Sequence, residues 1–417
     1  MSIKILHINT YDALGGAARA ARRIFQSQRA AGINCEMMVL HKSGSDPFIK
    51  TPQSLTPQKN LQVVHHLLQS YRLQKYSRNT ILHSFGDASA GIVDEINNGD
   101  SDIVHLHWIS GMLSVDDIAK ITKPIVWTLH DMWAFCGSEH ICFDEQSYFY
   151  SPPSVLRSVN DEKLIADLSK KTWLEKCEKW KNAEFSVVAP SSWLAHQARR
   201  SYLFKNSSVQ IIPYPLDADT AWTPSENRSV VRNKLKITDD RKIILFVAKN
   251  PLNDLNKGWD LALQALQKVM QEGSIHFDLV VVGQDDGIRA VTPFTSHWVG
   301  SVNNDTELAE WYSAADVLLV PSRVEAFSQV TAEAQSCALP VVGFSIGGIP
   351  DIVIHRQTGY VARAYDTDDF ADGILWVLSD NERRKTLSVS ARKNIVEKFS
   401  PGFVSDRYME LYSSIKP

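Results

Sequence analysis

The stretch DVLLVPSRVEAFSQVTAEA, residues 316–334, carries the clearest indication of the fold. It begins with an apolar run rich in branched residues, turns at a proline and a serine, and continues with apolar positions three or four apart. This order predicts a buried strand over 316–321 that leads through a short loop into a helix over 329–337. A strand followed at once by a helix is the repeating unit of parallel sheets covered by helices.

The same order recurs along the whole chain. In the second half we expect further strands over 243–248, 278–283 and 340–344, and further helices over 259–271, 306–315, 368–379 and 382–397. In the first half, strands over 3–9, 102–108, 124–130 and 185–190 alternate with helical patterns that include 17–31 and 172–182. The sequence therefore predicts an α/β protein built from two doubly wound, Rossmann-like domains.

Residues 213–224 separate the two halves. They carry three prolines and little periodicity, so they predict a linker. We expect an N-terminal domain over 1–212 and a C-terminal domain over 225–400. Open parallel sheets bind ligands at the carboxyl ends of their strands, and two such domains facing each other would form a cleft for a ligand.

Composition excludes several classes of protein. The 417 residues are 44% hydrophobic and 22% charged, which excludes a small disulfide scaffold, a disordered chain and a fibre. The net charge of -3 argues against general nucleic-acid affinity, which requires a basic surface. The five scattered cysteines fit a reducing compartment, and no apolar run is long enough to span a membrane. The N-terminus does not resemble a signal peptide, so we expect a cytoplasmic protein.

Two features in the first half fall where strands should end. Gly15 and Gly16 follow the first expected strand and precede a helix, a position where backbone amides can approach an anion. A tight turn explains the glycines equally well, and the third glycine of the dinucleotide-binding fingerprint is missing. His130, at the end of 124–130, would point into the cleft, although a core histidine is the competing interpretation.

Two further features follow strands of the second half. Lys249 and Lys257 flank the loop after 243–248 and could neutralise a diphosphate, unless they are ordinary surface lysines. Glu325 leaves the strand 316–321, and Glu333 comes eight residues later. Carboxylates accept two donors at once and so suit sugar and ribose hydroxyls. The amides near Phe327–Gln329 would begin a helix and could meet a phosphate.

Together these residues resemble a retaining glycosyltransferase of family 4, with the GT-B fold. Glu325 and Glu333 match its E-x7-E motif, the stretch 339–350 matches a strand with a Gly-Gly loop, and Lys257-Gly258 matches the lysine loop. The N-terminal pair of glycines matches as well. HDMWAFCG, residues 130–137, resembles a subgroup that acts in exopolysaccharide, capsule and lipopolysaccharide assembly.

The resemblance implies a metal-independent transfer of a hexose from a nucleotide diphosphate sugar, UDP- or GDP-linked, to a glycan or lipid-linked glycan. It gives catalytic roles to Glu325, which would hold the donor hexose, to His130, which would contact that sugar near the reacting centre, and to Lys257, which would stabilise the leaving diphosphate. No cofactor or metal is implied. The donor-binding residues that it implies are Gly15, Gly16, Lys249, Lys257, Glu325, Phe327, Ser328 and Glu333, with Glu333 on the ribose and Gly16 beside the phosphates.

Two positions depart from the family pattern. Lys249 stands where many members have arginine, so a bidentate phosphate contact is lost there. Ala326 stands where many have glycine, which makes the backbone approach beside Glu325 tighter. We expect activity to survive both departures.

Several expectations are left open by the residues. The last stretch, about 401–417, reads as a helix, and the fold resemblance implies that it packs back on the N-terminal domain. Residues 59–83 fit a long helix packed on its own domain or a helix at a membrane surface, which would give peripheral membrane contact. Cys136, His140 and Cys142 raise the question of zinc, although their spacing is not that of a CxxC pair.

Two other functions compete with transfer. One is a nucleotide-sugar epimerase of the same fold, which needs additional acid and base carboxylates. The other is a catalytically silent subunit that only binds sugar nucleotides. Retention of Glu325, Glu333, Lys257 and His130 favours the enzyme.

Overall fold

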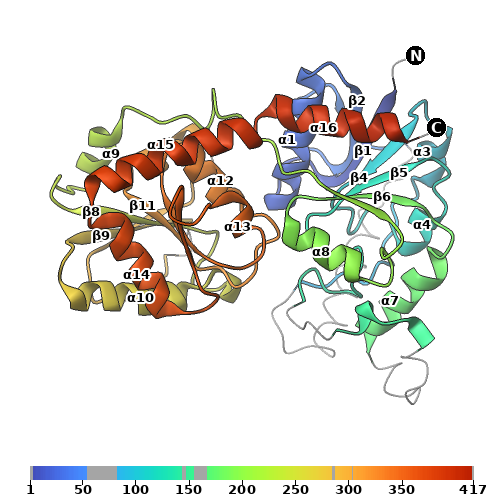
Figure 1. The fold of residues 1–417 in the computed structure, drawn as a ribbon. Coiled ribbons are helices and arrows are strands. Elements are labelled where there is room, and N and C mark those ends of the chain that lie inside the picture. Colours follow the sequence, from blue (N-terminus) through green and yellow to red (C-terminus); the bar gives the residue numbers. More distant parts are fainter. Residues whose placement is uncertain are drawn as a thin grey trace. The chain divides into compact units, whose positions relative to one another are not determined.

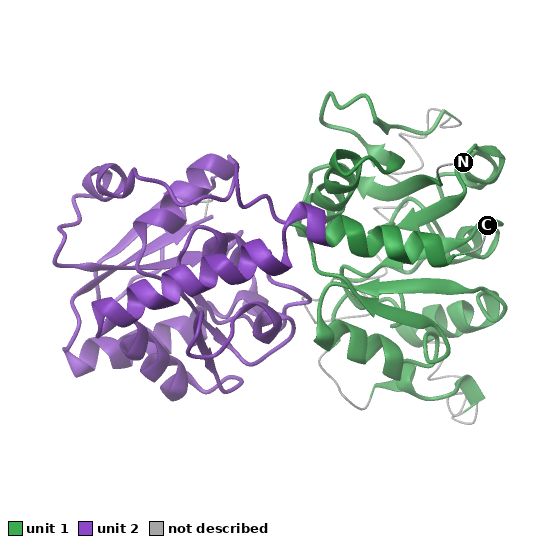
Figure 2. Ribbon diagram, turned by 45° about the horizontal axis from the view of Figure 1, so that its top comes forward, with its two compact units in different colours: residues 1–215, 404–417 green, residues 216–403 purple. Residues whose placement is uncertain are grey.

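The computed structural model describes residues 3–53, 82–142, 147–154, 167–283, 287–302 and 304–415. The chain divides into two compact units (Figures 1 and 2): unit 1 is residues 1–215 with 404–417, and unit 2 is residues 216–403. The first boundary falls inside the expected linker 213–224, whose second part belongs to unit 2. The cleft expected from the sequence stays a prediction. The helix predicted over 59–83 lies outside the described residues, except for its last two positions.

Unit 1 contains a seven-stranded parallel sheet in the order β3-β2-β1-β4-β5-β6-β7. Its strands are β1 (Lys4–Tyr11), β2 (Asn34–His41), β3 (Ile49–Lys50), β4 (Ile103–Leu106), β5 (Ile125–Thr128), β6 (Phe185–Ala189) and β7 (Ser208–Ile211). Its helices are α1 (Gly16–Ala30), α3 (Val93–Asn98), α4 (Val115–Ala119), η1 (Tyr148–Tyr150), α7 (Leu168–Lys179) and α8 (Ser192–Arg200). The strand order reverses between β1 and β4, which is where doubly wound sheets bind ligands.

Unit 2 contains a six-stranded parallel sheet in the order β10-β9-β8-β11-β12-β13. Its strands are β8 (Lys242–Val247), β9 (Phe277–Val282), β10 (Ser296–Gly300), β11 (Val317–Val320), β12 (Val341–Phe344) and β13 (Gly359–Ala362). Its helices are α9 (Arg228–Lys234), η2 (Leu255–Lys257), α10 (Trp259–Glu272), α11 (Asp305–Ala314), α12 (Gln329–Ser336), α13 (Ile349–Ile352), α14 (Thr367–Leu378) and α15 (Asn381–Lys398). The order reverses between β8 and β11. The prediction of two doubly wound parallel-sheet domains is confirmed.

The central strands of unit 2 form because they are apolar on both faces, as strands of covered parallel sheets must be. All residues of β9 and β11 are buried. Helices α10 and α14 lie side by side in unit 2 (Figure 1). Alternate side chains of the sheet pack on them in one core, with Leu266, Ile374 and Val377 among its members. The edge strand β10 was not predicted, because its residues SHWVG are all only half-buried and show no apolar run.

Two predicted strands of unit 1 were too long, and the correction bears on the site. The strand expected over 102–108 ends at Leu106, and the one expected over 124–130 ends at Thr128. His107 and His130 therefore lie just beyond the strands, in the loops at the carboxyl edge of the sheet.

The last helix, α16 (Pro401–Ser414), spans the second boundary between the units, and from Val404 onward it belongs to unit 1. Two of its tyrosines reach the sheet of that unit. The hydroxyl of Tyr408 lies 2.9 Å from Oγ1 of Thr128, and the hydroxyl of Tyr412 lies 2.6 Å from Nδ1 of His105. The end of the chain thus packs on strands β4 and β5.

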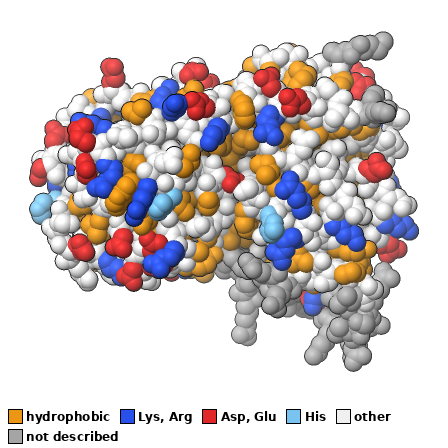
Figure 3. Space-filling view, viewed as in Figure 1, with side chains coloured by type: hydrophobic (Ala, Val, Ile, Leu, Met, Phe, Trp, Pro, Cys, Tyr) orange, Lys and Arg blue, Asp and Glu red, His pale blue; other side chains and the backbone are white. Residues whose placement is uncertain are grey.

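The charges on the surface and the hydrophobicity of the helices agree with what the composition indicated. On the face shown in Figure 3, side chains of both charge signs are interspersed. Among the described helices, none is both long enough and apolar enough to cross a membrane.

A buried carboxylate, Asp316, joins several elements of unit 2 at the edge of the sheet where β8 and β11 begin. Asp316, only 1% exposed, accepts the amide of Ile243 at 2.8 Å and pairs with Arg228 at 2.8 Å and Arg384 at 3.3 Å. It therefore joins the start of β8 to helices α9 and α15. Removing one partner of such a network leaves the remaining charges and amide without compensation.

We expect Asp316→Ala to lower the free energy of unfolding by about 3–5 kcal/mol, because the arginines around this buried carboxylate, including the buried Arg232 at 3.6 Å, lose their counter-charge. Urea unfolding measures this change. Asp100→Ala is the matched control, since Asp100 pairs with Lys4 at an exposed position and such pairs contribute about 1 kcal/mol or less. Equal losses in both variants would contradict this account of Asp316.

Candidate functional site

The core of the candidate site in unit 2 is an ion pair at the reversal of strand order. Lys257 ends η2, in the loop after β8, and Glu325 lies in the loop after β11. Nζ of Lys257 lies 2.9 Å from Oε1 of Glu325, and Oγ of Ser322 donates to the same oxygen at 2.9 Å. The structure thus brings together two of the three residues for which sequence indicated catalytic roles.

Three hydrogen bonds between the two loops fix their relative position. The side-chain amide of Asn256 donates to the carbonyl of Val324 and accepts the amide of Val324, both at 2.9 Å. The amide of Arg323 donates to the carbonyl of Asn256 at 2.7 Å. Since these bonds join the neighbours of both charged residues, the position of Lys257 relative to Glu325 is set by the backbone.

Two glycines allow the loops to approach this closely. Gly258 has φ +68°, and a Cβ there would lie 2.0 Å from the carbonyl oxygen of Pro321. Gly347, in the loop after β12, has φ +52°, and a Cβ there would lie 1.9 Å from the carbonyl oxygen of Glu325. That oxygen accepts the amide of Gly348 at 2.8 Å. A side chain at either glycine would displace the Glu325 loop.

Lys257 carries its charge in the folded protein. Burial lowers the pKa of Lys257, but the carboxylate of Glu325 outweighs burial and holds that pKa above its ordinary value. The lysine side chain keeps 30% of its exposure and the glutamate 14%. A fixed ammonium group at a partly open position can therefore meet an anionic ligand.

The other predicted residues of unit 2 have different surroundings. Glu333 is 3% exposed and accepts the hydroxyl of Tyr312 at 3.3 Å, so its contact is within the protein core. Phe327 is buried against Phe399, with ring centroids 5.9 Å apart. Lys249 is exposed just after β8. None of the contacts described for Glu333 or Lys249 reaches the Lys257–Glu325 pair.

Ser328 precedes helix α12 in a strained conformation. Its φ of 79° lies in the left-handed region, which is unusual for a residue with a side chain. Its hydroxyl lies 2.7 Å from that of Thr331 and makes no capping bond to the helix. A backbone conformation of this kind costs about 1–3 kcal/mol, and residues that adopt one are frequent at functional sites.

In unit 1, the two glycines begin α1. Gly15 has φ 90° and precedes the helix without a side-chain cap, and no atom lies within 4 Å of where its Cβ would be. Gly16 is the first helical residue, and both glycines are exposed. The conformation of Gly15 therefore requires glycine for its backbone angle and not for close packing.

His130 has both ring nitrogens engaged within unit 1. Nε2 lies 3.1 Å from Nδ1 of His107, and Nδ1 lies 2.7 Å from the hydroxyl of Tyr214. Burial lowers the pKa of His130 to about 4, against a smaller opposing effect of the Asp131 carboxylate. The ring is therefore neutral at pH 7.

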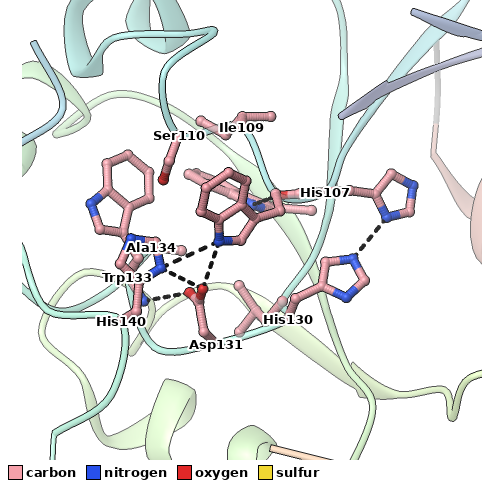
Figure 4. A pocket seen from close by; sticks show the side chains of 11 residues that line it. His107, Ile109, Ser110, His130, Asp131, Trp133, Ala134 and His140 are labelled. Atoms are coloured by element: carbon pink, nitrogen blue, oxygen red, sulfur yellow. Dashed lines mark hydrogen bonds and ion pairs between the residues drawn. The ribbon is translucent and has the colours of Figure 1, made fainter. Parts of the chain in front are cut away.

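Sequence reasoning missed the neighbouring carboxylate, Asp131, which lines a small pocket in unit 1 (Figure 4). Its Oδ2 lies 2.5 Å from Nδ1 of His140 and accepts the indole N–H of Trp108 at 3.0 Å, while Oδ1 accepts the amide of Trp133 at 2.9 Å. Burial raises the pKa of Asp131, but His140 and the hydrogen bonds outweigh it and lower that pKa overall. Its place in the sequence, directly after His130, could have indicated that Asp131 belongs to the same site.

The possible zinc ligands are not gathered. His140 is held by Asp131 and by the hydroxyl of Ser84 at 2.8 Å, and Cys142 lies 2.9 Å from the hydroxyl of Ser147. Cys136 is buried, and burial raises the pKa of its thiol. Within the described ranges, the side chains whose ligand atoms lie close enough together to hold a metal ion are instead His7, His105 and His107.

Comparison with known proteins now gives the family. The model described as "Glycosyltransferase Family 4" matches residues 14–220, and the model "Glycosyl transferases group 1" matches residues 241–380. The chain belongs to glycosyltransferase family 4. A D-inositol 3-phosphate glycosyltransferase from Xylanimonas cellulosilytica is 29% identical to this family 4 chain over 308 residues, which cover 70% of the chain and 67% of the relative. An uncharacterized glycosyltransferase from Methanocaldococcus jannaschii is 27% identical over 75% of both chains.

Solved structures share the fold of this glycosyltransferase. Sucrose-phosphate synthase from Thermosynechococcus elongatus has a TM-score of 0.64 at 18% identity, with 99% of this chain and 98% of that chain covered. Anabaena HepE in complex with UDP-glucose has a TM-score of 0.64 at 15% identity, with 99% and 100% covered. WaaG, a glycosyltransferase of lipopolysaccharide biosynthesis, has a TM-score of 0.61 at 17% identity, with 97% and 99% covered. The GT-B fold is therefore shown.

We expect Gly347→Ala to destabilise unit 2 by more than about 3 kcal/mol, because its Cβ would clash with the carbonyl of Glu325. Gly273→Ala is the matched control: Gly273 also has a positive φ, +66°, but no atom lies within 4 Å of its Cβ position. The control should lose only about 1–2 kcal/mol, the cost of the left-handed backbone. Thermal unfolding of the two variants measures both losses of stability. Losses of the same size would contradict the prediction, because they would mean that the loops move apart to accommodate the Cβ at position 347.

Burial of the unit 1 histidines predicts acid sensitivity. Burial lowers the pKa of His7 from 6.5 to about 3, so below pH 6.5 the unfolded chain takes up a proton that the folded chain does not. The free energy of unfolding therefore has its full value above pH 6.5 and falls as the pH decreases. His7 alone lowers it by about 2 kcal/mol at pH 5. Urea unfolding at pH 7 and pH 5 measures it.

His7→Gln should flatten this pH dependence, whereas His196→Gln should not, because His196 is exposed. The slope against pH is the quantity compared, so the loss of stability caused by each substitution does not interfere. An unchanged slope in His7→Gln would contradict the assignment.

Proposed function

We propose that this family 4 glycosyltransferase transfers a hexose from a nucleotide diphosphate sugar, with retention and without a metal ion, to a glycan or lipid-linked glycan in cell-surface polysaccharide biosynthesis. The observation that carries the proposal is the Lys257–Glu325 pair at the reversal of strand order in unit 2. It places one fixed cation and one fixed carboxylate where such sheets bind their ligands.

The chemistry divides between the two groups. The departing nucleoside diphosphate gains negative charge as the bond to the sugar breaks, and a preorganised cation stabilises that charge more than it stabilises the ground state. Lys257 would supply this cation. Glu325 would accept hydroxyl groups of the hexose, since its second oxygen, Oε2, has no partner among the bonds described for Lys257 and Ser322.

The remaining donor contacts are part of the same proposal. Lys249, exposed after β8, would move onto the diphosphate, and the amides at Phe327 and Ser328 would meet a phosphate oxygen at the start of α12. Glu333 would bind the ribose after exchanging its contact with Tyr312. In unit 1, Gly16 with Gly15 would let the backbone approach the phosphates, and His130 would contact the hexose.

Relatives guide the choice of substrates. HepE was solved in complex with UDP-glucose and WaaG is named for lipopolysaccharide biosynthesis, so we propose a UDP-linked donor in preference to a GDP-linked one and a lipid-linked glycan as acceptor. The inositol phosphate transferases are the relatives that favour a smaller acceptor. We further propose a cytoplasmic location with peripheral contact at the inner face of the membrane, where lipid-linked acceptors lie.

We expect a UDP-hexose, added with EDTA, to raise Tm by about 3 °C or more at saturating concentration, and slow release of UDP to follow. GDP- and ADP-hexoses are the parallel samples. Glu325→Gln should reduce release by about 100-fold or more, and Lys257→Met should weaken the thermal shift. Lys268→Met is the control, because Lys268 lies on α10 and pairs with Asp368.

The outcomes separate the alternatives. Binding without release would support a silent sugar-nucleotide-binding subunit, and conversion of the hexose to its epimer would support an epimerase. No response of the folded protein to any nucleotide sugar would overturn the proposal. Loss of activity with EDTA would overturn metal independence alone.

A further inference from the structure

Four histidines lie next to one another in the interior of unit 1. His7 belongs to β1, His105 to β4, His107 follows β4 and His130 follows β5. Ring centroids are 4.7 Å apart for His7 and His105, 4.3 Å for His105 and His107, and 5.3 Å for His107 and His130. The first three rings are 3% exposed or less. Such a group of imidazoles needs a complete set of hydrogen bonds to be buried at low cost.

Three of these rings form one continuous chain with two further side chains. Oε1 of Gln28 lies 3.1 Å from Nε2 of His7, and Nδ1 of His7 lies 2.9 Å from Nε2 of His107. Nδ1 of His107 lies 3.1 Å from Nε2 of His130, and Nδ1 of His130 lies 2.7 Å from the hydroxyl of Tyr214. Figure 4 shows the link between His107 and His130.

The amide oxygen at one end sets the direction of every bond. Because Oε1 of Gln28 only accepts, Nε2 of His7 must donate, and a neutral imidazole has one donor and one acceptor nitrogen. Nδ1 of His7 therefore accepts from His107, whose Nδ1 accepts from Nε2–H of His130. Nδ1 of His130 then accepts from the hydroxyl of Tyr214. The distances agree, because the tyrosine oxygen lies 2.7 Å from this nitrogen but 3.4 Å from the other acceptor, the carbonyl oxygen of Leu129.

A metal ion is the competing explanation, since His7, His105 and His107 could hold one. The hydrogen bonds argue against it. His105 does not join the chain: its Nδ1 lies 2.6 Å from the hydroxyl of Tyr412, and its Nε2 lies 2.7 Å from Oγ1 of Thr128. All six nitrogens of the three rings therefore have protein partners, and the cluster is complete without an ion.

The surroundings keep the rings neutral. Burial lowers the pKa of His105 and His107 well below the ordinary value, and the neighbouring imidazoles lower it further. Two smaller effects raise the pKa of these rings: the hydrogen bond of Gln28 to His7, and the Asp131 carboxylate beside His130, itself bonded to His140. Among the described residues, the hydroxyls of Tyr214, Tyr408 and Tyr412 also lie beside the cluster, and burial raises the pKa of each.

We propose that the chain Gln28–His7–His107 is a positioning device that holds His130 as the Nε2–H tautomer. Nδ1 of His130 is thereby an acceptor, and Tyr214 occupies it. A sugar hydroxyl that replaces the tyrosine hydroxyl meets an acceptor and never a donor. This consequence for substrate rests on the proposed function, whereas the tautomer does not.

Nitrogen NMR of the full chain with 15N-labelled histidine tests the tautomer without any substrate, because protonated and unprotonated ring nitrogens give well-separated signals. The wild-type protein at pH 7 should show His130 protonated at Nε2 alone. His130→Gln identifies its signals. In His107→Gln, His130 should become a mixture of both tautomers, since its fixed acceptor is lost.

His105→Gln is the matched control: it removes an equally buried histidine of the same cluster that lies outside the chain, and should leave the His130 signals unchanged. Tyr214→Phe addresses the other end and preserves all four rings, so it remains informative if His107→Gln does not fold. There His130 should stay protonated at Nε2, while the signal of Nδ1 shifts because a hydrogen bond is lost.

Four results would overturn the proposal: His130 protonated at Nδ1 in the wild type, equal changes in His105→Gln and His107→Gln, a switch of tautomer in Tyr214→Phe, or one equivalent of zinc in the purified protein. Failure of the proposed function gives a different pattern, namely the expected tautomer with no response to any nucleotide sugar. With turnover established, His107→Gln should lower kcat while His105→Gln leaves it near the wild-type value.

Discussion

Glu325 is the residue on which the geometry of unit 2 depends, because three loops meet at it. Its carboxylate accepts Lys257 from the loop after β8 and Ser322 from its own loop, and its carbonyl accepts Gly348 from the loop after β12. Parallel strands place the loops that follow them at one edge of the sheet, so this convergence needs no long connection. The positive φ of Gly347 is a consequence of the same contact.

Unit 1 meets a different constraint, the burial of polar rings. An imidazole can be buried neutral when each nitrogen has a partner. His7, His107 and His130 satisfy one another in this way, with Gln28 and Tyr214 at the ends. The network extends to Tyr214, next to one boundary of the units, and through Gln28 to Tyr412, which follows the other boundary and also bonds His105. The segment where the chain leaves unit 1 and the helix with which it returns therefore both contact the histidine cluster.

How far the site could be predicted depends on the kind of residue. Lys257 and Glu325 follow strands of clear apolar pattern, and the structure joins them. Glu333 has the correct spacing, yet its carboxylate faces Tyr312, because spacing along a helix does not say which neighbouring helix covers it. His130 was expected to face a ligand. That expectation stays a prediction. The structure shows that both of its nitrogens have protein partners, which come from positions 107 and 214 and which no local pattern indicated.

The class of fold and the family could both be predicted from the sequence, because apolar periodicity and short motifs are local properties of the chain. The tertiary structure alone decided which side chains meet. The contact between Lys257 and Glu325 spans 68 residues, and that between Gln28 and Tyr412 spans 384. Such contacts depend on strand order and register, and no local pattern of residues encodes the register between two strands so distant in the chain.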